Sequence, residues 1–459
     1  MKKLVLLLAF AGGSRYAMAQ QDLGVRNSNY AGIQGALLNP SSIAGSKLDW
    51  DVNILSINEL FANNFLYTPK SNLKFLGIGH IVQGSIKETI WGTRFDVNNP
   101  NKLYSVVSST EVLGPSFYMK VRKKHYIGLT IEGRAYGNVR NITGGLAQNA
   151  YAYFDQTDLF NTTLTDNTAN VNAMAWLQYG IHYATVLYQK GRDQLKGGLS
   201  LNYLQGIAAA YATNTHVTYA VNDTANINFS NSSLDYGRTN FDDFRKIRGY
   251  SSLNHGHGFG ADIGFTYVKA AKEADGYVYR IGLSLLDIGS INFNRNTATY
   301  HLATVNGNFE NWHQAKFSGN DQVDQTLSAV FYGGDSSASY TSSRFRMAMP
   351  AALSLQADYH VAKDFYANAT IVQGFHHGDR PGVVRPDVYS ITPRYETKWL
   401  EVSLPLSLLY YNYWQPRIGL AVRVGYFFFG GDAPGALLKL NDLQSADVYA
   451  GLRFFLTKK

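Results

Sequence analysis

Two groups of neighbouring histidines are the residues that come nearest to a metal site. They are His255-Gly256-His257 and His376-His377. A zinc site in a protein needs three or four converging ligands, with partners behind them that orient the rings. Neither group has an acidic residue at a matching spacing, and both lie in or beside glycine-rich segments. We therefore interpret them as hydrated loop histidines and expect no bound metal and no other cofactor.

Motifs for covalent or phosphoryl chemistry are missing from the sequence. There is no Gly-x-Ser-x-Gly elbow and no phosphate-binding loop of the P-loop type. The glycines at 256, 258 and 260 resemble a dinucleotide fingerprint, but no crossover helix pattern follows them. The sequence therefore predicts a protein that is not an enzyme.

Charged side chains instead recur on one face of the predicted strands. Five acidic and five basic residues share this inward register: Glu132, Arg134, Asp262, Arg280, Asp358, Arg394, Glu396, Glu401, Arg423 and Arg453. A charge held away from water is costly unless it is paired, so balanced signs predict ion pairs and hydrogen bonds across an interior space. This set either stiffens the wall of a barrel, or it holds a plug or lines a polar conduit.

The strands that carry these charges alternate with a period of two residues. In 400–410 large apolar residues alternate with Glu, Ser and Pro, and 277–288 has the same pattern. The last strand is predicted to face lipid with Val448, Ala450, Leu452, Phe454 and Leu456. An apolar face opposite small or charged residues is typical of a transmembrane barrel with lipid outside and a polar lumen inside.

Short turns and long polar loops alternate along the chain, as they do in outer-membrane barrels. With this rule the sequence predicts fourteen antiparallel strands with long extracellular loops, sixteen being the alternative. The predicted strands are 48–57, 111–122, 125–136, 174–189, 195–221, 256–271, 276–301, 350–361, 364–374, 386–396, 399–411, 416–423, 426–431 and 446–457. A turn centred between Thr397 and Lys398 would place Arg394 opposite Glu401, so we predict an ion pair there.

Composition agrees with an exported barrel. Of 459 residues only 16% are charged, 14% are aromatic, and none is cysteine. Residues 1–19 have the lysines, the apolar run and the Ala17-Met18-Ala19 site of a cleaved signal peptide. Its removal lowers the formal net charge from +8 to +5, a scattered basicity that gives no case for nucleic acid. The expected location is the outer membrane of a Gram-negative bacterium.

Between the signal peptide and the first strand lies a mostly polar segment, residues 20–47, which contains Asn39-Pro40-Ser41-Ser42. We expect it to enter the lumen as a plug or to bridge the periplasmic mouth. The remaining residues, 48–459, form a single barrel domain.

Several motifs resemble a family of Bacteroidota outer-membrane barrels of unknown function. They are Gly114-Pro115-Ser116-Phe117, residues 203–211 (YLQGIAAAY), residues 280–289 (RIGLSLLDIG), Pro393-Arg394-Tyr395-Glu396 and residues 446–452 (ADVYAGL). The early Asn39-Pro40 is similar, more weakly, to the start of fatty-acid-transporter-like barrels and of the shuttle barrel of type IX secretion. Those relatives have fourteen strands. The resemblance brings no catalytic residues.

Two functions remain open at this stage. The first is transport of a small hydrophobic or amphipathic molecule, and the alternative is an interaction scaffold for secretion or surface-protein assembly. Expected partners are outer-membrane lipid and lipopolysaccharide, the barrel-assembly machinery during insertion, and proteins of secretion or surface assembly. Because the inward charges are balanced, we also expect an occluded interior, unlike that of a general porin.

Overall fold

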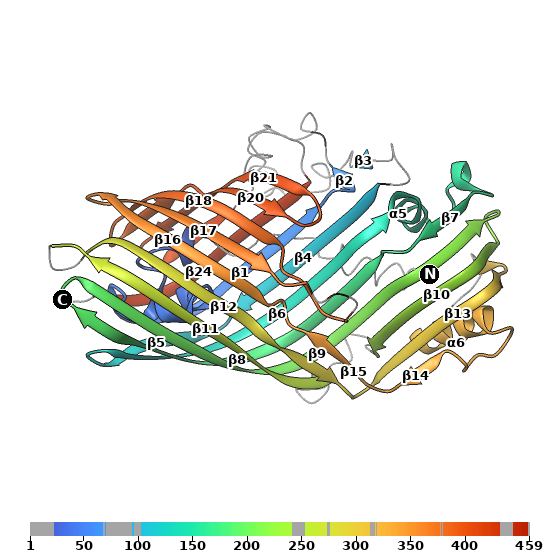
Figure 1. Cartoon of the computed structure of the whole chain (residues 1–459), viewed down its shortest axis with the longest axis horizontal. Coiled ribbons are helices and arrows are strands. Elements are labelled where there is room, and N and C mark those ends of the chain that lie inside the picture. Colours follow the sequence, from blue (N-terminus) through green and yellow to red (C-terminus); the bar gives the residue numbers. More distant parts are fainter. Residues whose placement is uncertain are drawn as a thin grey trace, which may run out of the picture.

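The computed structural model describes residues 23–67, 69, 94–95, 102–240, 253–272, 276–312, 317, 319–376, 378, 380–431 and 444–457. Its main body is a closed antiparallel barrel with 14 wall strands (Figure 1). The barrel closes where β1 (Leu48–Asn63) pairs with β24 (Ser445–Thr457). The predicted fold class and strand number are therefore confirmed.

Ten wall strands are continuous and four consist of two pieces each. The continuous ones are β1, β6 (His125–Thr143), β8 (Asn170–Lys190), β9 (Asp193–Val221), β11 (Gly256–Ala270), β12 (Tyr277–Phe293), β17 (Phe365–Gly374), β18 (Asp387–Glu396), β23 (Phe427–Gly431) and β24. The divided ones are β4 (Leu103–Leu113) with β5 (Ser116–Arg122), β15 (Phe345–Ala348) with β16 (Ala352–Ala362), β19 (Leu400–Ser403) with β20 (Leu406–Tyr410), and β21 (Trp414–Ile418) with β22 (Leu420–Val424).

Each interruption contains a proline or a glycine, namely Gly114-Pro115, Pro350, Pro405 and Gly419. Proline cannot donate to a strand ladder, and glycine weakens it, so both residues mark places where pairing is lost. At the first break the Asn53 side chain donates to the carbonyls of Leu113 and Gly114 at 3.0 and 3.1 Å. The wall therefore stays hydrogen-bonded although its strand is kinked.

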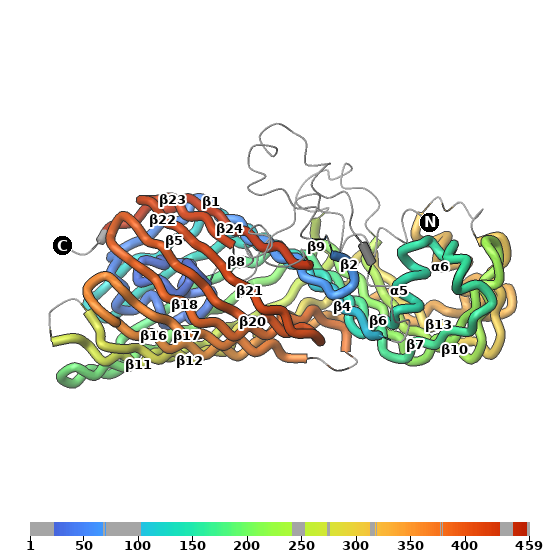
Figure 2. The backbone as a smooth tube through the Cα atoms, turned by 90° about the horizontal axis from the view of Figure 1, so that it is seen from above, coloured from blue at the N-terminus to red at the C-terminus, as the bar shows by residue number. Residues whose placement is uncertain are grey.

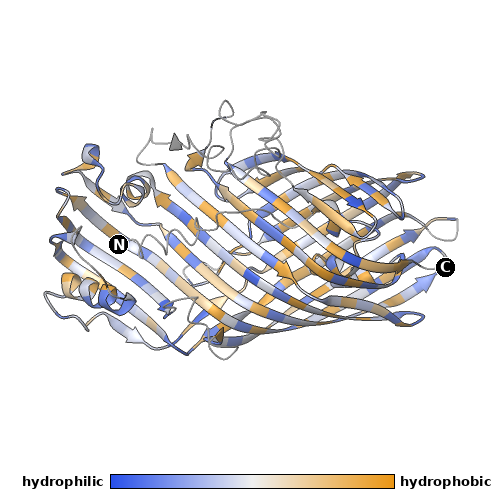
Figure 3. Cartoon of the chain, turned by 180° about the vertical axis from the view of Figure 1, so that it is seen from behind, coloured by the Kyte–Doolittle hydropathy of each residue, from blue (hydrophilic) through white to orange (hydrophobic). Residues whose placement is uncertain are grey.

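Side chains alternate across the wall as a membrane barrel requires. On β12, Ile281 and Leu283 are 47% and 48% exposed on the outside, whereas Ser284, on the inner face, is buried. On β24, Val448, Phe454 and Leu456 are exposed, and Ala450 and Leu452 are partly exposed. Figure 3 shows the same alternation as hydrophobic bands crossing the wall strands. The outside of the barrel is thus a broad apolar surface.

At one end of the barrel, called here the turn end, short turns join successive strands, such as those after Arg122 and Lys190. At the opposite loop end, wall strands continue beyond the barrel into an extension (Figures 1 and 2). Here β9 pairs with β10 (Ile227–Thr239), which pairs with β13 (Thr297–Phe309), which pairs with β14 (Tyr340–Ser342). Around them lie α5 (Gly144–Tyr151), η4 (Thr157–Leu159), β7 (Thr163–Asp166) and α6 (Asn320–Phe331).

The extension corrects two expectations. The segment 276–301 is not one strand, because the chain breaks between β12 and β13 at Asn296, which has a φ of +52°. The segments 222–255 and 302–349, which lie between predicted strands, contain β10, part of β13, α6, β14 and β15. The long strand expected at 195–221 is confirmed by β9. A separate pair, β2 (Leu66–Tyr67) and β3 (Arg94–Phe95), lies apart from the barrel sheet.

α6 is docked on the extension by charge and aromatic contacts. Arg238 donates to Asp321 at 3.0 Å and also pairs with Asp324, and the Tyr236 hydroxyl donates to Asp324 at 2.9 Å. Burial, and then the adjacent Asp324 carboxylate, raise the pKa of Tyr236 above its usual value. Among the residues that the structure covers, no helix is long and apolar enough to cross a membrane.

Candidate functional site: the filled lumen

Residues 23–46, called here the insert, lie inside the barrel near its turn end (Figure 2). They form α2 (Leu23–Arg26), η1 (Gly32–Leu37) and η2 (Pro40–Ile43). Tyr30, Ile33 and Ile43 of the insert pack in one apolar cluster with wall residues such as Tyr118 and Phe455. Within the described range the insert joins no strand ladder, so its hold on the wall depends on side chains.

The Asn39-Pro40 step sits on wall glycines. A Cβ at Gly198 of β9 would come within 3.0 Å of the Pro40 and Ser41 backbone, and one at Gly264 of β11 would meet the Asn39 side chain. Gly198 and Gly264 are directly opposite in the β9–β11 ladder. The wall therefore has a shallow seat in which only glycine leaves room for the insert.

Asn39 fastens the insert in that seat. Its side-chain oxygen accepts from the Ser41 amide at 3.0 Å, which begins η2. Its amide nitrogen donates to Gln356 at 3.0 Å and to Thr266 at 3.3 Å on the wall. One side chain thus shapes the turn and binds two wall strands, which explains the Asn-Pro pair in a polar stretch.

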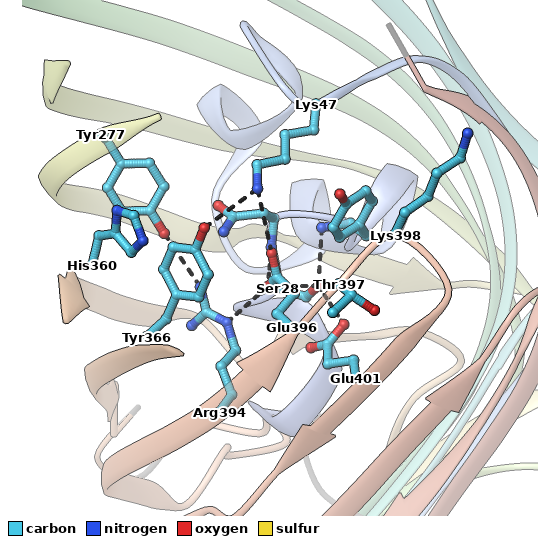
Figure 4. A network of polar contacts seen from close by, with 12 residues as sticks. Ser28, Lys47, Tyr277, His360, Tyr366, Arg394, Glu396, Thr397, Lys398 and Glu401 are labelled. Carbon is cyan, nitrogen blue, oxygen red and sulfur yellow. Dashed lines mark hydrogen bonds and ion pairs between the residues drawn. The ribbon is translucent and has the colours of Figure 1, made fainter. Parts of the chain in front are cut away.

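A second anchor joins the insert to two glutamates (Figure 4). Glu396 of β18 and Glu401 of β19 are direct ladder partners, although opposed like charges are unfavourable. The Ser28 hydroxyl donates to Glu401 at 2.7 Å, and the Asn29 amide donates to Glu396 at 3.0 Å. Two wall arginines compensate the negative charges, because Arg394 lies 2.9 Å from Glu396 and Arg423 lies 3.0 Å from Glu401.

The predicted ion pair between Arg394 and Glu401 is wrong. Arg394 lies opposite Ser403, because Thr397 bonds Leu400 through its amide and hydroxyl and leaves Lys398 and Trp399 as the turn. This turn centre is one residue later than expected, which moves every pairing by two positions. A shift of two keeps each side chain on its face. Arg394 therefore still points inward, but it binds Glu396 and, at 2.9 Å, Asp358.

Midway along the lumen an ion network joins the insert to the wall. Arg26 of the insert donates to Glu111 of β4 at 2.9 Å, and Arg134 of β6 lies 3.3 Å from the same carboxylate. Arg134 also donates twice to Asp287 of β12, at 2.6 and 2.8 Å. Arg385, from the segment between β17 and β18, donates to Asp287 at 2.5 Å. We call these five residues the central network.

Arg385 belongs to a second element that fills the lumen, this time from the loop end. Residues 381–385 run inward, and Val383 packs in an apolar cluster with Met174, Trp176 and Phe293. The segment is held by the side chain of Asn138, which exchanges two hydrogen bonds with the Val384 backbone at 2.8 and 3.0 Å. The lumen is thus closed from both ends, and the two closures meet at the central network.

A polar cavity of about 530 Å³ lies beside the insert at the turn end. Insert residues such as Asn29 and Ser42 line one side of it, and Lys123 and Lys124 of a turn and Gln189 near the end of β8 also line it. Three regions therefore follow one another along the barrel: the apolar cluster around Val383 (called here the apolar compartment), the central network and this cavity.

All ten predicted inward charges are at least partly buried, and most fall into these networks. Arg134 belongs to the central network, Asp262 accepts from the Asp287 amide at 2.6 Å, and Glu132 is buried two residues before Arg134. Arg394, Glu396 and Glu401 belong to the network drawn in Figure 4, and Arg280, Asp358 and Arg423 extend it, with Arg280 2.6 Å from Asp358 and Arg423 3.0 Å from Glu401. Arg453 stands apart, 4.0 Å from Asp51.

Sequence analysis missed four members of the central network. Arg26 lies in the polar leader of the barrel and Arg385 in an expected loop, while Glu111 and Asp287 were not selected among the inward charges. Asp287 has a φ of +53° beside a register shift, which disturbs the strict period of two. Of the four histidines considered for a metal site, His257 and His376 are exposed as expected, His255 is buried, and His377 lies outside the described residues. No group of three metal-ligating side chains occurs in the described ranges.

Comparison with known proteins gives a family without an assigned role. No curated protein matches the chain. Among solved structures, a deletion mutant of the monoaromatic hydrocarbon channel TodX has a TM-score of 0.44 at 10% identity, covering 94% of this chain and 95% of that one. The Pseudomonas putida toluene transporter TodX gives 0.32 at 7% identity over 94% and 95%. A Pseudomonas aeruginosa FadL homologue gives 0.23 at 9% identity over 92% and 93%. Residues 44–432 match the family of unknown function DUF5723, and the chain belongs to that family.

Proposed function

We propose that this protein lies in the outer membrane and passes a small amphipathic molecule through its lumen, with the insert as a gate. The observation that carries the proposal is that two segments of the chain, and not the wall, close the barrel. The wall strands are joined by strand ladders. Residues 23–46 are held to the wall by side-chain contacts, and residues 381–385 are held by the Asn138 side chain and by two backbone hydrogen bonds to Ala348. Segments held in this way can leave the lumen while the barrel remains intact.

The order of the compartments supports an amphipathic substrate. From the loop end inward, a molecule would first meet aromatic and methionine side chains, then the central network, and then the polar cavity. Apolar pockets with a few polar groups bind the apolar part of a ligand and orient its polar part. A purely apolar molecule would find no partner in the second half of this path.

Displacing the insert without altering the wall tests the gate. Gly198→Ala adds one methyl group that overlaps the Pro40 and Ser41 backbone, whereas a Cβ at Gly133 meets nothing nearer than 3.7 Å. In planar bilayers and in liposomes we expect the wild type and Gly133→Ala to be closed to ions. Gly198→Ala should open intermittently, and deletion of residues 23–46 should leave a lasting leak.

Solute selectivity tests the substrate class in the same liposomes. In Gly198→Ala a short-chain fatty acid should enter faster than a sugar of similar mass, because the apolar compartment favours the alkyl chain. Equal rates would indicate a general pore. A variant without residues 23–46 that stays closed would show that residues 381–385 or wall side chains block the lumen without the insert, and the insert would be refuted as the gate.

A scaffold function is the second candidate, and the extension favours it. This surface stands clear of the barrel and exposes Val305 by 75% and Tyr340 by 52% on β13 and β14. A photoreactive residue at Val305 in intact cells should crosslink to one defined partner if the extension is a docking surface. The same residue at lipid-facing Ile281 is the control, and identical products at both positions would exclude a specific partner.

A further inference from the structure

The polar cavity at the turn end is strongly basic. Seven basic side chains line it and only one acidic side chain, that of Asp358, does so. The basic ones are Arg26, Lys47, Lys120, Lys123, Lys124, Lys196 and Arg280. Charges of one sign gathered in a concave, partly enclosed site raise the local concentration of the opposite ion.

The cations at the inner end of the cavity already have acidic neighbours. Arg26 pairs with Glu111, and Arg280 lies 2.6 Å from Asp358. Lys47 lies 4.0 Å from Glu396, donates a long hydrogen bond of 3.4 Å to the Tyr366 hydroxyl, and faces the rings of Tyr30 and Tyr366. Its positive charge is therefore only partly satisfied within the lumen.

At the mouth of the cavity the positive charge is not compensated. Lys123 and Lys124 form the turn between β5 and β6 and are exposed, and within the described residues neither has an ion pair. Lys120 faces Asp49 at 3.8 Å, with both side chains about a third exposed. The mouth therefore carries more positive than negative charge.

Independent evidence for a ligand comes from unused hydrogen-bond donors in the cavity lining. Asn29 is 7% exposed, and its side-chain nitrogen has no hydrogen-bond partner. The Ser42 hydroxyl, also in the lining, is buried and unpartnered. Buried donors are almost always satisfied in folded proteins, so two unused donors on residues that line the same basic cavity are suited to the oxygens of a bound anion.

We propose that this cavity is a binding site for a compact oxyanion of the phosphate or phosphoryl type, held by the side-chain nitrogen of Asn29 and by Lys47 and attracted by Lys123 and Lys124. The source is either free phosphate or the phosphoryl group of an amphiphile. The site follows from the cavity alone and does not depend on transport, because a barrel that never opens would still bind an anion from the turn end.

Binding by purified full-length mature protein in a nonionic detergent tests the site. The probes are inorganic phosphate and dodecyl phosphate, measured by titration calorimetry. Lys123→Ala with Lys124→Ala should weaken binding of the active probe about tenfold at low salt, and the difference should shrink at about 0.5 M NaCl. Asn29→Ala should weaken it at both salt concentrations, because it removes a hydrogen bond.

The matched control removes two turn lysines that are not part of the cavity lining, as Lys272→Ala with Lys363→Asn. Asparagine suits position 363, where φ is +39°. This control should bind as the wild type does. Binding of inorganic phosphate supports a free anion, and binding of dodecyl phosphate alone supports an amphiphile. No binding of either probe, or equal weakening in both lysine doubles, overturns the site. Heat-modifiable gel mobility confirms that each variant is folded.

Discussion

Asp287→Asn should destabilise the barrel more than its small size suggests. Asp287 accepts three hydrogen bonds at 2.5 to 2.8 Å from Arg134 and Arg385, whose side chains are 3% and 4% exposed. Asparagine keeps the shape and tolerates the left-handed backbone at this position, so the substitution removes the negative charge without changing the side-chain volume or the backbone. It also turns an N–H group toward a guanidinium. Removing one partner from a buried ion pair costs about 3–5 kcal/mol.

Urea unfolding in detergent micelles, followed by heat-modifiable gel mobility, measures this loss. Asp321→Asn is the matched control, because its side chain is 75% exposed although it also pairs with an arginine at 3.0 Å. An exposed pair contributes at most about 1 kcal/mol, so the control should unfold almost as the wild type does.

A compensating variant separates charge imbalance from lost packing. Adding Arg385→Met to Asp287→Asn removes the cation that the first change leaves unpaired, and should recover about 1–3 kcal/mol. Equal losses in Asp287→Asn and Asp321→Asn would refute the reasoning. So would a double variant whose loss equals the sum of the two single losses, because the two charges would then be independent.

Three further predictions follow from the wall, the second anchor and the extension. Phe454→Arg, on the lipid-facing side, should cost about 2–4 kcal/mol in the urea assay, whereas Tyr340→Arg on the extension should not change stability. Arg423→Met and Glu401→Gln should each destabilise the barrel, but their double variant should lose less than the sum, and strict additivity would contradict their 3.0 Å contact. The raised pKa of Tyr236 means that the folded extension favours the neutral phenol. The stability of the folded extension is therefore highest below pH 10, the ordinary pKa of tyrosine, and falls as the pH rises above it. Circular dichroism of α6 unfolding at high pH should show this. Tyr236→Phe should weaken the dependence, and the remainder is due to the stacked Tyr300, whose pKa is also raised by burial and by Asp324.

The barrel could be predicted from the sequence because its wall has one consistent environment on each side. Strands such as 400–410 alternate strictly, and turns and loops alternate in length. The extension could not be predicted in the same way. β10 has the sequence INFSNSSLDYGRT, in which polar residues occupy both faces, and its residues are exposed, half-buried and buried without a period of two. A sheet with water on much of both sides gives no apolar stripe.

The site was predictable in its residue types but not in its contacts. A period of two places Arg394 and Glu401 on the inner face whatever the turn is, and the structure has both of them buried. Their partners depend on a turn whose centre lies one residue later than expected. Arg26 and Arg385 come from segments without periodicity, so only the folded chain shows that they reach Glu111 and Asp287.

The insert and the wall form one packing unit, which explains why the wall has small residues where a barrel would otherwise need large ones. A barrel of this size leaves space that wall side chains do not fill. Gly198 and Gly264 widen that space at the seat, and the opposed Glu396 and Glu401 make the bare wall unfavourable. The insert fills the seat with Asn39-Pro40. Its Ser28 hydroxyl and Asn29 backbone N–H donate hydrogen bonds that partly compensate the two carboxylates. A wall built in this way is stable when filled, and a gate that returns to its seat regains these contacts.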